Sequence, residues 1–285
     1  MTGKSLWITL FSLGCLGIYL FVSAPPPLDE QKNQQAAIPV EQMFSVLQAE
    51  NAAVRAMWTR EIVGEGKKVG LKFDEHWRDA DLDAGPLPAL FLRETAKSME
   101  KSPVRLSLFL GSDYPISPDN RFEGLQQEKF QALRESRQAQ FFYVPDTGLH
   151  TAMFADIAVA EPCIACHNKH EQSPKHDWRL NDVMGAATWM YPESVVTLQD
   201  TLKAITVLHQ GIRDAYQAYL DKVLTFAHPP VIGEHWPRDG YYLPSLEVFM
   251  QAFLQRAAPY TLSVLGDLAN VRQSNPLKES RDGVK

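Results

Sequence analysis

Two cysteines and a histidine stand together near the middle of the chain, in the run Cys163-Ile164-Ala165-Cys166-His167. This run has the pattern C-x-x-C-H, which is the attachment signature of c-type haem. Two thiols separated by two residues can each add across one vinyl group of a haem, and the histidine that follows can give an imidazole nitrogen to the iron. The sequence therefore predicts one covalently attached haem c, with Cys163 and Cys166 as the thioether residues and His167 as the proximal iron ligand.

Other uses of this motif explain the sequence less well. A zinc site needs a second pair of ligands at suitable spacing, and the only other cysteine of the chain is Cys15. A thioredoxin-like motif does not need the histidine and expects a βαβ context that the pattern lacks. A disulfide between Cys163 and Cys166 would close a small, strained ring. Haem attachment is the favoured chemistry.

The sequence does not assign the sixth position of the haem iron. Haem prefers histidine or methionine there, and the candidates are Met57, His150 and Met153. An open or water-filled position is an equal alternative. No acid–base constellation can be argued around the motif, so no catalytic residue is predicted and the protein is not expected to be an enzyme. Peroxidase-like activity at an open haem face stays an alternative.

The N-terminal segment is apolar from Leu6 to Ser23 and follows Lys4. A helix of about 18 residues spans about 27 Å, which is close to the thickness of the hydrocarbon core of a bilayer. We expect residues 1–24 to form an uncleaved membrane anchor, which places the rest of the chain on the periplasmic side of the bacterial inner membrane.

Two alternatives remain for this segment. A signal peptide cleaved after Ala24 would leave a soluble periplasmic protein, although Pro25 should block the peptidase. Lipidation of Cys15 is the third interpretation, and the residues before Cys15 fit it less well.

Composition excludes several classes of protein. Of the 285 residues, 45% are hydrophobic and 22% are charged, which is typical of a globular protein and not of a disordered one. The net charge of −6 gives nucleic acid no electrostatic footprint. Three cysteines are too few for a disulfide scaffold.

The chain after the anchor divides into a linker over 25–40 and a haem-bearing domain over 41–192. In this domain the spacing of apolar residues predicts a helix from Glu41 that ends at Gly64 or Gly66. It also predicts helices over 89–101 and 122–134 and strands over 104–110, 140–144, 153–159 and 183–191. Because helices come first and short strands follow, the predicted class is α+β.

A long helix is predicted over 193–228, in which ten residues recur in steps of three and four. These residues are Val195, Leu198, Leu202, Ile205, His209, Ile212, Tyr216, Tyr219, Val223 and Phe226. The spacing is that of a coiled-coil seam. Packing against one other helix of the same protein gives the same pattern, so an intermolecular coiled coil and an internal contact both stay open.

The last third of the chain repeats features of the first. Glu75-His76-Trp77 recurs as Glu234-His235-Trp236, and Val54-Arg55 with Trp58 is echoed by Ile212-Arg213 with Tyr216. Leu87-Pro88, Pro103 and Leu106-Ser107 recur as Leu243-Pro244, Pro259 and Leu262-Ser263. We predict a haemless, mostly helical partial repeat over 229–270, or about 207–267 as a whole, and then a polar tail over 271–285. The repeat predicts a homodimer or an intramolecular pseudo-dimer.

The residues after the haem motif resemble a known family. They include Ser173-Pro174-Lys175, Asp177-Trp178-Arg179 and Asp182-Val183-Met184-Gly185. Together with Val54-Arg55, Leu87-Pro88 and Asp113-Tyr114-Pro115-Ile116, these runs are similar to the PAS-like, single-haem c-type domain of bacterial cyclases, chemoreceptors and histidine kinases, which also occurs as a stand-alone cyanobacterial cytochrome. The resemblance covers about 41–192 and implies a PAS-like antiparallel sheet in which Cys163, Cys166 and His167 bind haem.

Two departures from that family bear on function. The stand-alone member is thought to use a cysteine as sixth ligand, and this chain has none available. The sensor relatives continue into a cytoplasmic output module, for which this chain has no signature. We therefore expect an electron-transfer cytochrome, or the haem subunit of a membrane complex, that works with a redox partner protein. The alternative is a redox or gas sensor domain that acts through a partner.

Overall fold

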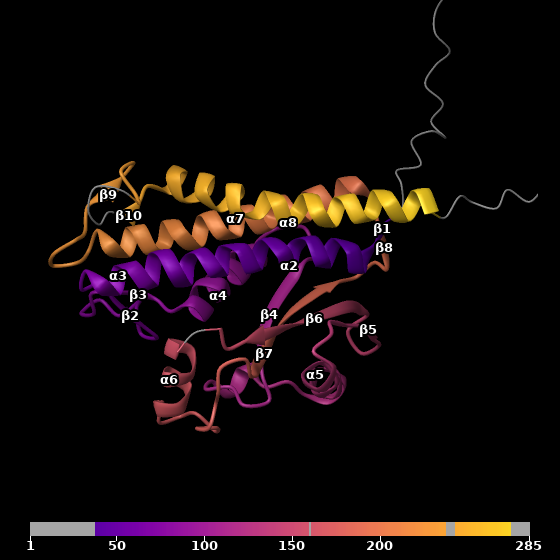
Figure 1. Ribbon diagram of the computed structural model, residues 1–285, viewed down its shortest axis with the longest axis horizontal. Coiled ribbons are helices and arrows are strands. Elements are labelled where there is room, and N and C mark those ends of the chain that lie inside the picture. Colours follow the sequence, from indigo (N-terminus) through magenta and orange to yellow (C-terminus); the bar gives the residue numbers. More distant parts are fainter. Residues whose placement is uncertain (1–37, 160, 238–242, 275–285) are drawn as a thin grey trace, which may run out of the picture. The chain divides into compact units, whose positions relative to one another are not determined.

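The computed structural model describes residues 38–159, 161–237 and 243–274 (Figure 1). The predicted anchor over 1–24, most of the predicted linker and residues 275–285 of the predicted tail lie outside the described residues. Among the helices that are described, none combines the length and the apolar character needed to cross a bilayer.

A four-stranded sheet forms the centre of the first half. Its strands are β4 (Ser107–Gly111), β5 (Gln140–Val144), β6 (Leu149–Ile157) and β7 (Val183–Tyr191). The order in the sheet is β4-β7-β6-β5, and every neighbouring pair is antiparallel. The predicted α+β class is confirmed, and the sheet is antiparallel as expected.

The strand predicted over 153–159 begins earlier than its sequence pattern indicated. β6 starts at Leu149 because a tight hairpin turn precedes it, in which Gly148 has a φ of 68° and its N–H bonds to the carbonyl of Val144 at 2.9 Å. A residue without a Cβ adopts this backbone conformation at little cost. The strand ends at Ile157, two residues before the predicted end.

The helices of the first half include α6, which contains the haem motif. After β1 (Ile38–Pro39), one helical run comprises α2 (Val40–Met57), the π-helical segment η2 (Trp58–Gly64) and α3 (Glu65–Lys68). The parallel strands β2 (Lys72–Asp74) and β3 (Ala84–Pro86) lead to α4 (Pro88–Met99). The remaining elements are the short 3₁₀ turn η3 (Pro118–Asn120), α5 (Gly124–Ser136) and α6 (Glu161–Lys169).

The second half is shorter and mostly helical. β8 (Val195–Val196) pairs with β1, and α7 (Leu198–Val223) begins at a capping box in which Thr197 and Asp200 bond to each other's backbone N–H groups. The helix is thus shorter at both ends than the predicted 193–228. The parallel strands β9 (Ile232–Gly233) and β10 (Leu243–Pro244) then lead to α8 (Leu246–Ser274).

Two sequence pairings of the predicted repeat are not matched by secondary structure. Leu106 and Ser107 lie at the start of β4, whereas Leu262 lies within α8, which stays helical to Ser274. Pro103 follows the end of α4, whereas Pro259 lies inside α8. At this position the described second half is helical where the first half has a strand, because α8 does not end where α4 ends.

The main core lies between the sheet and the helices, and the most extensive helix contacts join α4 to α7 and α2 to α8. Figure 1 shows α2, α7 and α8 side by side above the sheet. In the predicted heptad seam, the C-terminal part from Ile212 to Val223 is buried inside the same chain. Its first members are not: Val195, Leu198 and Leu202 are about half exposed. The internal contact is the interpretation that fits the C-terminal part of this seam.

Replacement of Gly211 by alanine tests how closely α4 and α7 approach. A Cβ at this position would lie 2.8 Å from the carbonyl oxygen of Thr95 and 2.9 Å from Cγ of Met99. In an open helix the same change stabilises by about 1 kcal/mol, because glycine is a poor helix former. We expect Gly211→Ala instead to lower the free energy of unfolding by about 1–3 kcal/mol, as measured by urea denaturation.

The control is Ala218→Gly, a change of helix propensity at a half-exposed position of the same helix. It should cost about 1 kcal/mol without any steric contribution. A stabilising effect of Gly211→Ala would show that the two helices are not in close contact.

Candidate haem-attachment site

Helix α6 places the three motif side chains on one face. Cys163, Cys166 and His167 stand three and four residues apart within Glu161–Lys169, and residues at these spacings are neighbours on a helix surface. Both cysteines are free thiols; Cys163 is half-buried and Cys166 is exposed. The local helix thus gathers the predicted thioether residues and the predicted iron ligand without any distant contact.

An adjoining side of α6 is fixed to the end of the sheet. Ile164, the second residue of the motif, is buried against Ala158, which follows β6, and against the indole ring of Trp178. Met184, at the start of β7, packs against this small cluster. The apolar contact sets which face of the helix turns away from the sheet.

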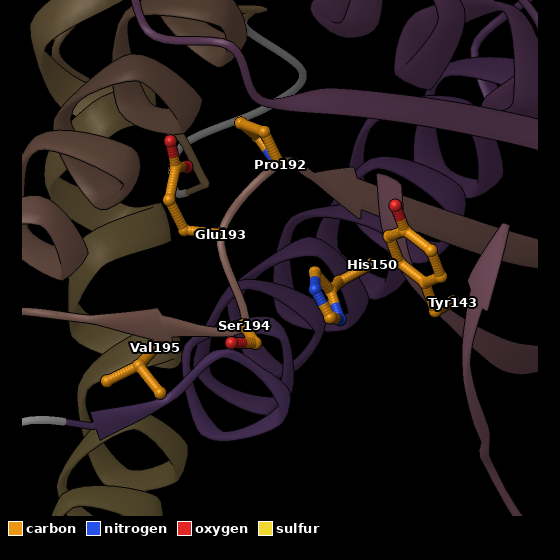
Figure 2. A pocket seen from close by; sticks show the side chains of 6 residues that line it. All are labelled: Tyr143, His150, Pro192, Glu193, Ser194 and Val195. Atoms are coloured by element: carbon orange, nitrogen blue, oxygen red, sulfur yellow. The ribbon is translucent and has the colours of Figure 1, made fainter. Parts of the chain in front are cut away.

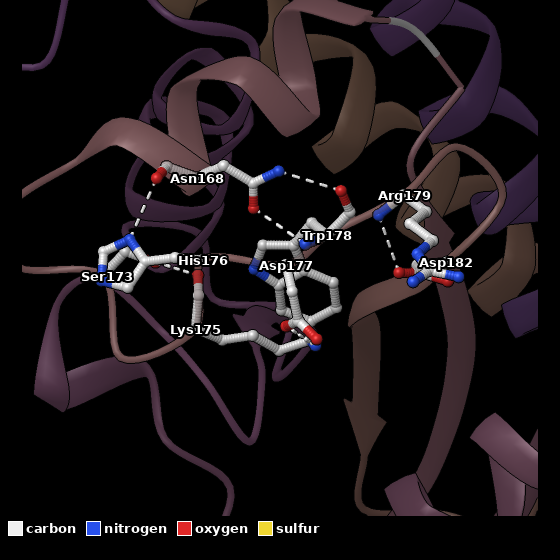
Figure 3. Close-up of polar contacts among 8 residues, drawn as sticks. All are labelled: Asn168, Ser173, Lys175, His176, Asp177, Trp178, Arg179 and Asp182. Atoms are coloured by element: carbon white, nitrogen blue, oxygen red, sulfur yellow. Dashed lines mark hydrogen bonds and ion pairs between the residues drawn. The ribbon is translucent and has the colours of Figure 1, made fainter.

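Asn168, directly after the motif, clamps the following loop to α6. Its side-chain amide donates to the carbonyl of Trp178 at 2.9 Å and its side-chain oxygen accepts from the Trp178 N–H at 2.8 Å (Figure 3). The carbonyl of Asn168 also lies 3.0 Å from Nδ1 of His176. Two bonds from one amide to one residue hold the loop in a single register.

The rest of the loop is closed by contacts drawn in the same figure. The ammonium group of Lys175 pairs with Asp177 and lies 4.8 Å from the centre of the Trp178 ring (Figure 3). The N–H of Arg179 donates to the Asp182 carboxylate at 2.9 Å. The backbone of Asp182 in turn accepts from the N–H of Ala158 at 2.9 Å. The Ser-Pro-Lys and Asp-Trp-Arg runs are therefore structural supports of α6.

His167 has the electronic state that iron ligation needs. Burial lowers the pKa of its imidazole, an effect that the nearby Asp156 carboxylate opposes and that His170 reinforces. The ring is therefore neutral at pH 7 and keeps a nitrogen lone pair. Its Nδ1 atom is buried and has no hydrogen-bond partner among the described residues. An orphaned, neutral imidazole beside two free thiols fits a covalently attached haem.

A carboxylate from a distant segment lies at the rim of the site. Glu75, which follows β2, bonds to Nε2 of His170 at 3.0 Å. Although Cys166 is exposed on the surface, the protein around it raises the pKa of its thiol, chiefly through partial burial and then through the negative charge of Glu75, while Lys67 opposes the shift. The C-terminal end of α6 thus faces the segment formed by α3 and β2.

None of the three residues considered for the sixth ligand belongs to the apolar cluster that holds α6. Met57 belongs to the main core, and Met153 lies in a separate cluster with Phe122 and Phe130. His150 stands seven residues before the end of β6, which at about 3.3 Å per residue is roughly 20 Å along the strand. The sixth position of the iron stays unassigned.

His150 instead lines an open pocket of about 550 Å³ at the other end of the sheet. Figure 2 shows its imidazole ring beside that of Tyr143, with the segment from Pro192 to Val195 on the opposite side. The centres of the two rings are 4.9 Å apart. His150 therefore packs against Tyr143 through this ring contact.

Sequence reasoning did not give roles to three residues of the site. Asn168 could have been found, because a side chain with both a donor and an acceptor directly follows the motif. Glu75 was noted only as part of a repeated triplet. The role of Asp156 could not be predicted from neighbouring residues. Its ion pair with Arg55 of α2 joins segments about one hundred residues apart.

Comparison with known proteins gives one match. A family model described as Tll0287-like matches residues 27–192, more than half of the chain. Neither the curated proteins nor the solved structures give a match. The match confirms the family resemblance predicted from the sequence, and that family is one of single-haem c-type domains.

The clamp made by Asn168 is open to direct measurement. Asn168→Ala removes both bonds to Trp178, and at roughly 1 kcal/mol for each bond we expect a local loss of about 1–3 kcal/mol. Hydrogen exchange of the Trp178 amide should accelerate accordingly, by about tenfold or more. Asn168→Asp keeps the acceptor and should give an intermediate rate.

His176→Ala serves as the control, since it removes a contact to the backbone of Asn168 and leaves the side-chain clamp in place. Unchanged exchange at Trp178 in Asn168→Ala would mean that the loop is held by other contacts.

Proposed function

On the premise that this chain belongs to the Tll0287-like family, we propose that it is a periplasmic c-type cytochrome that carries one haem and transfers electrons. The observation that carries the proposal is the shared face of α6, on which two free thiols stand beside a neutral imidazole whose Nδ1 atom has no partner among the described residues. The bound haem would supply the one-electron redox chemistry.

Each residue of this face has a defined part in attachment. The thiols of Cys163 and Cys166 each give their sulfur to one carbon of a vinyl group and their hydrogen to the other, so that a C–S bond forms and no oxidant is consumed. His167 offers a nitrogen lone pair because burial keeps its pKa low. The support by Ile164, Asn168 and Trp178 holds these groups in one orientation before attachment.

Exposure of part of this face favours electron transfer. Cys166 lies at the surface, so a partner protein can approach the edge of the site that this thiol would bind. The apolar segment over 1–24 supports an uncleaved anchor, which would keep the cytochrome on the periplasmic side of the inner membrane near a membrane complex. Cleavage after residue 24 would give a soluble periplasmic carrier with the same site.

A haem-based redox or gas sensor that acts through a partner is the second candidate. It is favoured by one observation, namely that Met57 and Met153 pack in apolar clusters other than that of α6 and that His150 lines a pocket at the other end of the sheet. An iron position without a protein ligand is one that an external molecule can occupy.

Loss of the two thiols tests the foundation of the proposal. We expect Cys163→Ala/Cys166→Ala, expressed with the cytochrome c maturation machinery, to retain no haem after denaturing electrophoresis, whereas each single variant keeps one thioether bond. The matched control is Cys15→Ala, which changes the remaining cysteine and should leave haem staining unchanged. Covalent haem in the double variant would rule out attachment at α6.

Carbon monoxide distinguishes the two candidate functions. Electron transfer predicts a six-coordinate ferrous haem whose absorption spectrum does not change when carbon monoxide is added. A sensor predicts a five-coordinate haem that binds the gas with a shifted Soret band. Rapid, saturable binding in the full chain would therefore favour sensing over electron transfer.

A further inference from the structure

The second half of the chain repeats the helical part of the first at one constant spacing. α7 begins at Leu198 where α2 begins at Val40, and α8 begins at Leu246 where α4 begins at Pro88, so that each start is 158 residues after its counterpart. A parallel two-stranded pair lies between the two helices in both halves, β2–β3 in the first and β9–β10 in the second. We call α2–α4 the first helical pair and α7–α8 the second.

The same interactions recur in both pairs at this spacing. Nε1 of Trp58 donates to the carbonyl of Pro86 at 3.2 Å, and the hydroxyl of Tyr216 donates to the carbonyl of Pro244 at 2.7 Å. The Trp58 ring stacks on Phe91 with centres 4.1 Å apart, and the Tyr216 ring stacks on Phe249 at 3.8 Å. A hydrogen bond and a ring stack that both shift by 158 residues are a structural repeat.

The two pairs pack in the crossed manner of a two-fold dimer. In an isologous interface, a contact from element i to element j is accompanied by the contact from j to i. Here α2 packs on α8, the counterpart of α4, and α4 packs on α7, the counterpart of α2 (Figure 1). Each helix of one pair therefore finds its main helical partner in the other pair.

Residues on a two-fold axis must touch their own counterparts, and three such contacts occur. Ile38 pairs with Val196 in the antiparallel strands β1 and β8. Trp58 meets Tyr216 edge to face at 6.1 Å, and Phe91 meets Phe249 in the same manner at 6.1 Å. All three pairs have the spacing of 158 residues, so they mark one pseudo-two-fold axis through the helices.

One face of the second pair is exposed where the corresponding face of the first pair is covered. Gln48 of α2 accepts from the Trp189 indole of the sheet at 2.9 Å, and Phe44, one turn earlier on the same helix, is fully buried. Their counterparts on α7 are Thr206 and Leu202, and both are exposed, Leu202 by 55%. The face that α2 turns to the sheet is left open on α7 because the described part of the second half contains no counterpart of the four-stranded sheet.

We propose that the first helical pair carries a self-association surface that can bind a second copy of the same pair. In this chain α7–α8 is a half-copy that occupies this surface. The protein is then an intramolecular pseudo-dimer with a single haem-attachment site. This inference concerns assembly, and its test does not depend on the haem.

The ion pairs at the interface provide the test and its control. Arg256 of α8 bonds to Glu61 of η2 through Nε at 3.0 Å and through a second guanidinium nitrogen, and so joins the two helical pairs. Arg213 bonds to Glu247 at 2.7 Å within the second pair. Arg256→Glu with Ala257→Arg, a buried neighbour on α8, should release α8 from α2. Arg213→Glu makes the same charge change as Arg256→Glu alone, without acting between the pairs.

Sedimentation equilibrium of the full chain in density-matched detergent measures the result. We expect the native chain and Arg213→Glu to stay monomeric over the accessible concentrations. The release variant should show an approximately twofold rise in mass, because the freed surface takes a second copy. Adding Ala96→Arg, at a buried position of α4, should return the release variant to a monomer.

Two results would overturn the proposal. One is a release variant that stays monomeric, or that aggregates without a defined mass. The other is a dimer that persists after Ala96→Arg, which would place the contact elsewhere. Should the double change prevent folding, Arg256→Glu alone decides the question, because its side chain is about one-third exposed and its loss leaves the core intact. That variant must then form mixed dimers with a labelled copy of itself, which Arg213→Glu must not form.

Discussion

Helix α2 is in contact with both the sheet and the helices of the second half, and the arrangement of the other elements follows from these contacts. Its buried residues, from Val40 to Met57, occupy one broad side of the helix. The sheet contacts the helix where Gln48 bonds to Trp189, and the helices of the second half contact it as well. The carboxylate of Glu50, only 3% exposed, is held by His209 of α7 and Thr261 of α8. A buried charge of this kind is tolerable only when hydrogen-bonding partners surround it.

The attachment site depends on this core indirectly, through the sheet. β6 ends and β7 begins at the small cluster of Ile164 and Trp178, so the orientation of α6 depends on strands that also contact α2. Arg55 of α2 pairs with Asp156 of β6, and Asp156 in turn acts on the pKa of His167. A continuous series of contacts thus connects the packing of α2, through the strands, to the charge state of the His167 imidazole.

Local patterns predicted the parts of the structure that local physics decides. The spacing of the motif gave the shared face of α6, and apolar periodicity gave most helices and strands, although the turn at Gly148 moved the start of β6. Contacts made by Glu75 and Asp156 could not be predicted, because they join segments far apart in sequence. In the repeat, the leucine–proline and Pro103–Pro259 matches suggested a shorter spacing than the structure has, since Pro259 lies inside α8 and Pro103 lies after α4.

The half-open face of α7 and the crossed helices bear on what counts as a unit of this protein. The family match ends at residue 192, but the compact unit begins at residue 38 and includes the described residues of the second half, to residue 274. The region that matches the family model and the region that packs as one compact unit therefore have different boundaries. A segment chosen by homology alone would expose the side of α2 and α4 that the second half now covers, and the free energy of folding belongs to the longer unit.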